Sequence, residues 1–440
     1  MRSRAVRKRY EDAIARLFAL QSRGIRMGVS RMHEALRWRG RPDRGLVFLH
    51  VTGTNGKGST SAMLASCLRE AGYRTGLYTS PHLHRWTERI RIDGRPISEA
   101  EAARRIGDVL DAFAQPGAPE TTFFELTTLC AIEAFRDHAC DVCVMEIGLG
   151  GRLDATNATA SALSVVTGVA LDHTNILGPT VEMIAREKAG IFRRGVPVVV
   201  GARDAAARRV LTRRARAVGA PLWLVGRDYD VTVGAAGTRV AGTPRVDVRA
   251  GTRVLRDLRL GLAGAHQADN AACAVAGLWR LRDRGWRIPD AAIRRGLARS
   301  RWPGRLERVP GSPPLLLDAA HNPDGARTLA RYLAATAPAH TTVLVFGAMK
   351  DKDYRASLRT LAPHIARAFY PPRRMQRGAT HAALNRVLPG TRAHNMRDAL
   401  ARARRAAGKH GLVVVTGSIF VVAEARALAL GVRSDPFIRM

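Results

Sequence analysis

The chain has 440 residues, is 46% hydrophobic and carries a formal charge of +34, so it can bury more than one core and is expected to form two or more domains. Only six of its 71 basic residues are lysines and arginine occurs throughout, which favours compositional bias over a dedicated surface for nucleic acid. The five cysteines lie in apolar runs and no apolar run is long enough to cross a membrane, which together predict a cytoplasmic protein without a disulfide framework.

Strands and helices alternate along most of the chain. Apolar runs predict strands at 45–51, 73–79, 140–147 and 162–170, a hairpin in ERIRIDGRPI at 88–97, and helices at 57–71, 98–114, 125–138, 266–284 and 289–300. Such alternation is typical of a mostly parallel sheet wrapped by helices, an α/β fold. Short alternating runs near 228–260 predict a small β addition.

A domain boundary is expected near residue 302. The stretch RSRWPGRLERVPGSPP at 299–314 concentrates proline, glycine and arginine, as linkers do. Strand–loop–helix segments follow it, which predicts a smaller Rossmann-like domain. We therefore expect an N-terminal domain over 1–302, including the β addition, and a C-terminal domain over 303–440.

The segment VTGTNGKGST at 51–60 has the chemistry of a phosphate-binding loop (P-loop). It lies between a predicted strand and a predicted helix and places three glycines around Lys57. Gly58 separates Lys57 from Ser59, so the strict P-loop pattern is not met. Glycine N–H groups and a helix N-terminus still suit phosphate oxygens, Lys57 can reach the terminal phosphates, and a hydroxyl can bind Mg²⁺. A plain glycine-rich turn is the alternative.

Further motifs narrow this interpretation. After GTNGKGS come, in order, LYTSPHL (77–83), ERIRIDG (88–94), MEIGLGGRLDATN (145–157), LDHTNILG (171–178), REKAGIF (186–192), HQADNAA (266–272), RWPGRLE (301–307), LDAAHNP (317–323) and VTGS (415–418). Together they resemble the dihydrofolate synthase/folylpolyglutamate synthase family of the Mur ligase superfamily. The resemblance implies a two-domain fold, with an ATP-binding domain of P-loop type followed by a Rossmann-like glutamate-ligase domain.

The implied reaction is an ATP-dependent ligation. The γ-phosphoryl group of ATP would activate a carboxylate of dihydropteroate or of a reduced folate as an acyl phosphate, which the amine of L-glutamate would then attack. Phosphoryl transfer depends mainly on positioning and charge neutralisation, so cations and metal ligands are the expected parts. The expected partners are these small molecules, with no specific nucleic acid, no membrane and a monomeric chain.

Two Mg²⁺ ions are implied by the resemblance, held by Ser59, Ser80, Glu146 and His173. Glu146 ends the apolar run DVCVMEI, at the edge where parallel sheets bind ligands, and a carboxylate suits a hard cation. A solvated surface glutamate is the alternative. Considered alone, His173 would be a capping or core histidine, because imidazole is an unusual magnesium ligand.

Lys188 matches a family lysine that is carbamylated by CO₂, a reaction that arginine cannot undergo. An exposed helical lysine is the alternative.

The resemblance also implies which residues form the site. The catalytic residues implied are Lys57, Lys188, His173 and Arg305. The implied ATP contacts are Thr54, Asn55, Gly56, Lys57, Gly58, Ser59, Thr60, Asn270, Arg305 and Asp318. Glutamate is assigned to Arg89, His321 and Ser418, although Arg89 could be a surface charge of the hairpin and Ser418 a helix N-cap.

Two other functions remain open from the sequence. One is a Mur-type ligase that acts on another carboxylate, such as a UDP-sugar peptide, and the other is a non-catalytic, polyanion-binding relic of the fold. Thr87 and the Ile176–Leu177 pair depart from residues common in the family. Both departures lie near expected substrate contacts, so they bear on substrate preference more than on the reaction type.

Overall fold

The computed structural model describes residues 2–24, 26–234, 243–373 and 376–435. The chain divides into two compact units: the first comprises Met1–Thr232, Val246–Leu260 and Ala268–Ser300, and the second Val233–Arg245, Gly261–Gln267 and Arg301–Met440. The single boundary near 302 stays a prediction. Part of the expected β addition, residues 235–242, lies outside the described residues.

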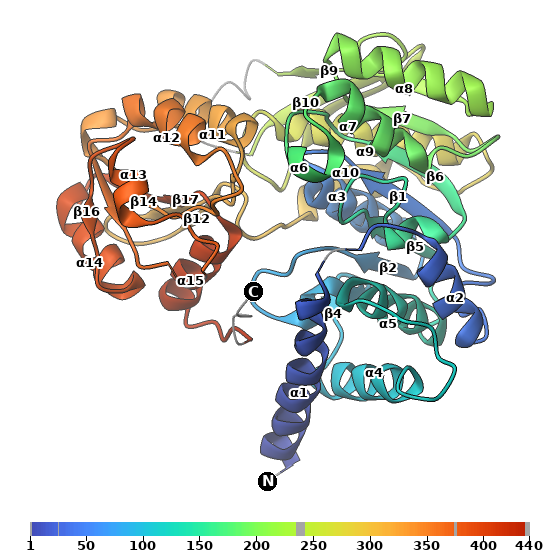
Figure 1. The fold of residues 1–440 in the computed structure, drawn as a ribbon. Helices are drawn as coiled ribbons and strands as arrows, with labels where there is room; N and C mark the ends of the chain where they lie inside the picture. The colour runs from blue at the N-terminus through green and yellow to red at the C-terminus, as the bar shows by residue number, and fades with distance from the viewer. Residues whose placement is uncertain (1, 25, 235–242, 374–375, 436–440) are drawn as a thin grey trace. The chain divides into compact units, whose positions relative to one another are not determined.

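The first unit is built on an eight-stranded sheet with the order β4-β3-β2-β5-β1-β6-β7-β8 (Figure 1). Its strands are β1 (Phe48–Thr52), β2 (Thr75–Tyr78), β3 (Ile90–Ile92), β4 (Arg95–Pro96), β5 (Val142–Glu146), β6 (Ser161–Val166), β7 (Val198–Val200) and β8 (Leu222–Leu224). Strands β2 and β5 to β8 pair in parallel with β1 or with one another, and the β3–β4 hairpin is antiparallel. Every residue of β1 and β5 is buried, as expected for parallel strands with both faces covered.

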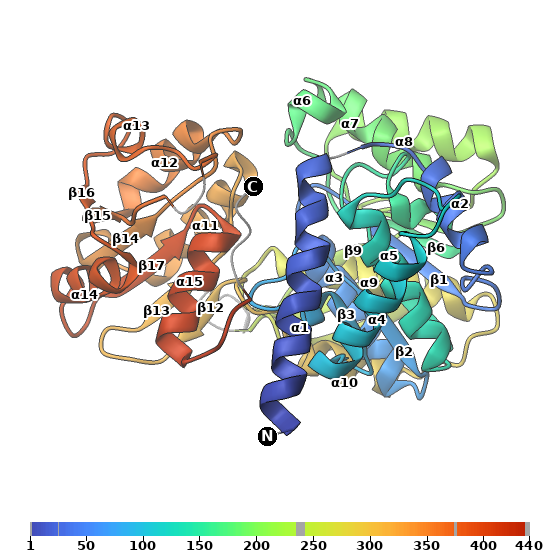
Figure 2. The same ribbon diagram turned by 60° about the horizontal axis from the view of Figure 1, so that its bottom comes forward.

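Helices cover both faces of this sheet. They are α1 (Arg2–Ala19), α2 (Ser30–Trp38), α3 (Lys57–Glu70), α4 (Glu99–Ala112), α5 (Phe123–Asp137), α6 (Thr174–Leu177), α7 (Val181–Lys188), α8 (Ala205–Val218), α9 (Gln267–Arg282) and α10 (Asp290–Arg299). Figures 1 and 2 show α1, α4 and α5 packed together. Trp86 and Phe135 belong to the buried core beneath these helices. Helix α3 packs against α10, where a Cβ on Gly296 would lie 2.6 Å from the backbone nitrogen of Cys67. Glycine therefore permits the close approach of these two helices.

The second unit has its own six-stranded sheet, with the order β12-β13-β17-β14-β15-β16. Its elements are β12 (Glu307–Val309), β13 (Leu315–Leu317), α11 (Pro323–Thr336), β14 (Thr342–Phe346), α12 (Tyr354–Leu361), β15 (Arg367–Tyr370), α13 (His381–Asn385), β16 (Thr391–Arg392), α14 (Met396–Ala407), β17 (Leu412–Thr416) and α15 (Ile419–Leu430). Only β12 runs antiparallel to its neighbour. It lies within the stretch expected to be a linker, so part of that stretch is regular structure. A separate three-stranded sheet is formed by β9 (Asp230–Val233), β10 (Arg245–Ala250) and β11 (Arg253–Arg259). All of its residues except Val233 and Arg245 belong to the first unit.

Candidate active site

The glycine-rich loop between β1 and α3 is held in a defined shape. Gly53 and Gly56 have φ angles of 154° and 86°, which favour glycine. The Thr54 N–H donates to the Gly168 carbonyl (2.8 Å), and the Thr167 hydroxyl donates to the Asn55 carbonyl (2.6 Å). The loop is therefore tied to the segment that follows β6.

Lys57 begins α3 and folds over the loop. Its ammonium donates to the carbonyls of Gly53 (2.9 Å) and Thr54 (3.1 Å). On the first turn of α3, Ser59 is buried, and the buried Thr60 hydroxyl has no hydrogen-bond partner within the described part of the chain. A buried hydroxyl without a partner is costly unless something else binds it. The loop therefore fits phosphate oxygens or a metal ion.

Asn270 of α9 touches the same loop. A Cβ on Gly56 would overlap the side-chain amide of Asn270, so these two residues are in direct contact. The structure thus brings together two segments more than 200 residues apart that were both expected to bind ATP. Gly56 cannot carry a side chain without displacing Asn270.

Glu146 ends β5 beside the loop. It lies opposite Val51 in the β1–β5 register, is only 6% exposed, and its Oε2 accepts the Ser80 N–H (3.2 Å). The alternative of a solvated surface glutamate is thereby excluded. Ser80 and Glu146, two of the four expected metal ligands, are therefore neighbours at the carboxyl ends of β2 and β5.

His173 precedes α6 and has a positive φ of 50°. Its side chain is 37% exposed, does not cap the helix, and has Nε2 4.0 Å from the Asp172 carboxylate. It is therefore neither a core histidine nor a side-chain cap. Within the described residues, no group of three or more His, Cys, Asp and Glu side chains could hold a metal ion, and the expected set contains only two such residues beside two hydroxyls.

Lys188 is the last residue of α7 and is only 3% exposed. Burial, with the nearby charge of Lys57, lowers the pKa of Lys188 to about 7, although Asp172 acts in the opposite direction. An exposed helical lysine is excluded. An amine with such a pKa is about half uncharged at neutral pH, and its neutral form can act as a nucleophile.

Arg89 is buried, not a surface charge of the hairpin. Its Nε donates to His82 Nδ1 (2.8 Å), and its guanidinium lies 5.3 Å from the ring centre of Phe123. Burial lowers the pKa of Arg89, although Tyr78 and Glu146 partly offset that effect. Neither His82 nor Phe123 was expected in the site from the sequence. The only signal for His82 was its place in the TSPHL stretch.

The expected residues of the second unit gather at the carboxyl end of β13. The Asp318 carboxylate accepts the N–H groups of Leu306 (2.9 Å) and Ala320 (3.0 Å), and its burial raises the Asp318 pKa. Arg305 and the His321 ring each contact the Ala319 carbonyl, at 3.2 and 3.0 Å.

Ser418 follows the neighbouring strand β17. Its hydroxyl accepts the Phe420 N–H (3.2 Å) at the start of α15. The helix N-cap considered as its alternative is therefore present.

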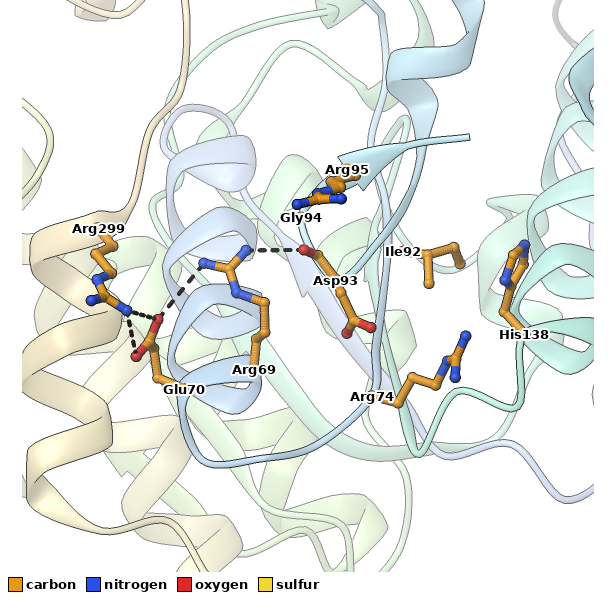
Figure 3. A pocket seen from close by; sticks show the side chains of 9 residues that line it. All are labelled: Arg69, Glu70, Arg74, Ile92, Asp93, Gly94, Arg95, His138 and Arg299. Atoms are coloured by element: carbon orange, nitrogen blue, oxygen red, sulfur yellow. Dashed lines mark hydrogen bonds and ion pairs between the residues drawn. The ribbon is translucent and has the colours of Figure 1, made fainter. Parts of the chain in front are cut away.

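A hollow of about 690 Å³ lies at the amino-terminal ends of the strands of the first sheet, away from the phosphate loop at their carboxyl ends (Figure 3). It is next to the amino ends of β2 and β5 and the end of α3. Its lining is Arg69, Glu70, Arg74, Ile92, Asp93, Gly94, Arg95, His138 and Arg299. Glu70 is paired there with Arg299 (2.8 Å), and Arg69 donates to the Asp93 carbonyl (3.2 Å). None of the expected site residues lines this hollow.

Comparisons with known proteins agree with this geometry. Residues 51–278 match the Mur ligase middle domain, and residues 304–419 match the Mur ligase glutamate ligase domain. A dihydrofolate synthase/folylpolyglutamate synthase from Bacillus subtilis is 33% identical over 95% of this chain and 98% of its own length. The chain belongs to the dihydrofolate synthase/folylpolyglutamate synthase family of Mur ligases.

Solved structures of this family have the same fold. Escherichia coli FolC in complex with DHPP and ADP matches with a TM-score of 0.85 and 33% identity, over 94% of this chain and 97% of that one. A bifunctional folylpolyglutamate synthase/dihydrofolate synthase with Mn, AMPPNP and L-glutamate bound matches with a TM-score of 0.84 and 34% identity, over 94% and 97%. The α/β fold class, the family and the ligase class expected from the sequence are confirmed.

Proposed function

We propose that this ligase uses ATP and a divalent metal ion to add L-glutamate to dihydropteroate and to reduced folates. The observation that carries the proposal is the arrangement at the carboxyl edge of the first sheet. There the phosphate loop, the buried Glu146 and the buried Lys188 lie within one unit. This arrangement suits the activation of a carboxylate by phosphoryl transfer.

The loop from Thr54 to Thr60 would hold the phosphates of ATP. Its glycine N–H groups, the start of α3 and the Lys57 ammonium supply positive potential, and Asn270 adjoins the loop. Arg305 and Asp318 would be the further nucleotide contacts that the family resemblance implies. Ser59, Ser80, Glu146 and His173 would hold two Mg²⁺ ions, which when bound neutralise charge on the phosphates.

Lys188 would carry a carbamate. Its neutral amine would attack CO₂, forming an N–C bond and releasing one proton to solvent, so that a neutral amine becomes an anionic carbamate. The pKa of about 7 supports this assignment, because the neutral amine is then well populated at neutral pH. The resulting carboxylate would steady a neighbouring residue of the metal site, as the family resemblance implies.

Arg89, His321 and Ser418 would bind L-glutamate. Arg89 is the most informative of the three, because its buried guanidinium donates to a neutral imidazole. An anionic substrate group would satisfy that charge with a bidentate contact. His321 and Ser418 would add hydrogen bonds.

We also propose a monomeric, cytoplasmic enzyme. All five cysteines are buried free thiols, which suits a reducing compartment. Within the part of the chain that the structure describes, no helix is long and apolar enough to cross a membrane.

Substrate-dependent phosphate release tests the proposed function. The purified chain, ATP, Mg²⁺ and L-glutamate are offered either dihydropteroate or a UDP-muramoyl peptide. We expect release with dihydropteroate alone. Release only with the UDP-muramoyl peptide would favour the cell-wall ligase, and salt-sensitive RNA binding without any turnover would favour the non-catalytic relic.

A further inference from the structure

Residues on both sides of Lys188 are held against the loop that follows β5. The contacts of Arg152 and Asn157 with Glu187 and Gly190 form a clamp between the two segments. The Arg152 N–H donates to the Glu187 carbonyl (2.8 Å), immediately before Lys188. The Arg152 guanidinium also holds the Glu187 carboxylate, at 2.7 and 3.0 Å. On the other side of Lys188, a Cβ on Gly190 would overlap the Arg152 backbone. The two segments are therefore in direct backbone contact.

Asn157 closes this clamp from the buried side. It is 6% exposed, and its Nδ2 donates to the carbonyls of Arg152 (3.1 Å) and Gly190 (3.3 Å). Its Oδ1 accepts the Arg193 guanidinium (2.7 Å), which also donates to the Gly190 carbonyl (2.9 Å). One amide thus joins both segments, and Arg193 orients that amide.

We infer that Asn157 is a positioning residue for the Lys188 carbamate, acting through the Gly190 and Arg152 carbonyls, with Arg193 as its support. This inference rests on the proposed function of Lys188. The β5 loop continues directly from Glu146, so the clamp fixes the backbone on both sides of Lys188 relative to the expected metal ligand. Helix α7 has only eight residues, and a short helix depends on such tertiary contacts for a fixed position.

The hydrogen bonds made at position 157 call for a carboxamide side chain. The position needs two donors aimed at carbonyls and one acceptor aimed at a guanidinium, which a carboxamide supplies and a carboxylate does not. Asn157→Asp keeps the size and the contact with Arg193 but places an oxygen against two carbonyl oxygens. It should displace the Lys188 turn without opening a cavity.

The test compares Asn157→Asp and Arg193→Gln with wild type and with Arg194→Gln, an exposed arginine next in the chain. Glutamate ligation is measured as a function of added bicarbonate in CO₂-depleted buffer, and the carbamate is observed by ¹³C NMR with labelled bicarbonate. Thermal melting reports folding. We expect both clamp variants to melt cooperatively, to need about ten-fold more bicarbonate for half-maximal activity and to show a weaker carbamate signal. Arg194→Gln should match wild type.

The outcomes separate the two proposals. A wild-type protein that ligates glutamate with no carbamate signal and no response to bicarbonate would overturn the role of Lys188 and this inference with it. A clear wild-type signal that both clamp variants reproduce, at the same bicarbonate concentration, would overturn the role of Asn157 alone. If Asn157→Asp fails to fold, Arg193→Gln decides, because it leaves the amide in place and removes the Arg193 contacts to that amide and to the Gly190 carbonyl.

Discussion

Lys188 is buried close enough to Lys57 for the ammonium of Lys57 to help lower its pKa, which lies at about 7. Lysine is rare in this chain, and these two lysines contribute different properties to one site. Lys57 is a cation that can reach phosphate, whereas Lys188 is an amine that readily loses its proton. Charge on the phosphate loop and reactivity at the end of α7 are therefore coupled.

Replacing Lys57 with alanine should abolish turnover and leave the fold intact. Removing one well-placed cation or donor from a phosphoryl-transfer site costs about 10²-fold to 10³-fold or more in kcat. The half-buried side chain packs little core, so the melting temperature should change by only a few degrees. Phosphate release and thermal melting measure both effects, with the exposed Lys409→Ala as control. A kcat near the wild-type value would remove Lys57 from the mechanism.

Lys188→Arg should be inactive although it retains a positive charge, because a guanidinium cannot form a carbamate. Lys188→Ala should also be inactive but should recover part of its activity with acetate or another short-chain carboxylate that replaces the carbamate. The measurement is the initial ligation rate with increasing carboxylate concentration. Full activity of the arginine variant would contradict the assignment.

The stability of the metal-free, CO₂-free protein should depend on pH through Lys188. Its pKa is lowered in the folded state, so between about pH 7 and its usual value the unfolded chain binds more protons. The free energy of unfolding should therefore rise with pH in that window, by up to about 1.4 kcal/mol per pH unit. Urea unfolding of wild type and Lys188→Met at pH 7, 8 and 9 isolates the effect by difference. A constant difference would show that the amine is not desolvated.

Arg89→Met should impair substrate binding more than folding. Burial of the Arg89 cation costs desolvation free energy that its neighbours only partly offset, so an apolar side chain of similar length should leave stability unchanged or raise it. The KM for glutamate should rise by about ten-fold or more, because a charge-assisted contact is lost. Kinetics and melting are measured together. A large fall in melting temperature with an unchanged KM would make Arg89 a structural residue.

Gly190→Ala should disturb the site although it adds a single methyl group. The Cβ would collide with the Arg152 backbone, which cannot rotate away, so overpacking should cost about 1–3 kcal/mol and reduce activity. Gly107→Ala is the matched control. Apart from the backbone of its own helix and its chain neighbours, no atom of the described residues lies within 4 Å of its Cβ position. Gly107 lies inside α4, where alanine should stabilise by about 0.5–1 kcal/mol. Equal stability of the two variants would argue against a tight contact at Gly190.

The strands of the first sheet could be predicted because fully buried parallel strands are continuous apolar runs in the sequence. The phosphate loop and Glu146 could be placed for the same reason, since each directly follows such a run. Strand order could not be predicted, because β5 lies between β1 and β2 only through long-range pairing. The expected linker was partly wrong for a similar reason: the short strand β12 is recognisable only by its pairing with β13.

Burial was the main site property that local sequence patterns did not reveal. Arg89 alternates with apolar residues like an exposed hairpin charge, and its contact with His82 depends on how the TSPHL stretch folds back. Asn157 lies 33 residues from Gly190 in the sequence, so its contact with the Lys188 turn has no local signature. The metal ligands, Lys188 and the glutamate contacts depend on the family resemblance and stay predictions.

Product analysis tests the central claim most directly. Purified protein is incubated with ATP, Mg²⁺ and L-glutamate, and dihydropteroate and tetrahydrofolate are offered in separate reactions. Mass spectrometry should then detect dihydropteroate and tetrahydrofolate that have each gained a glutamyl residue, with ADP formed in equal amount. Unchanged masses for both acceptors, in a preparation that is folded and binds ATP, would contradict the account.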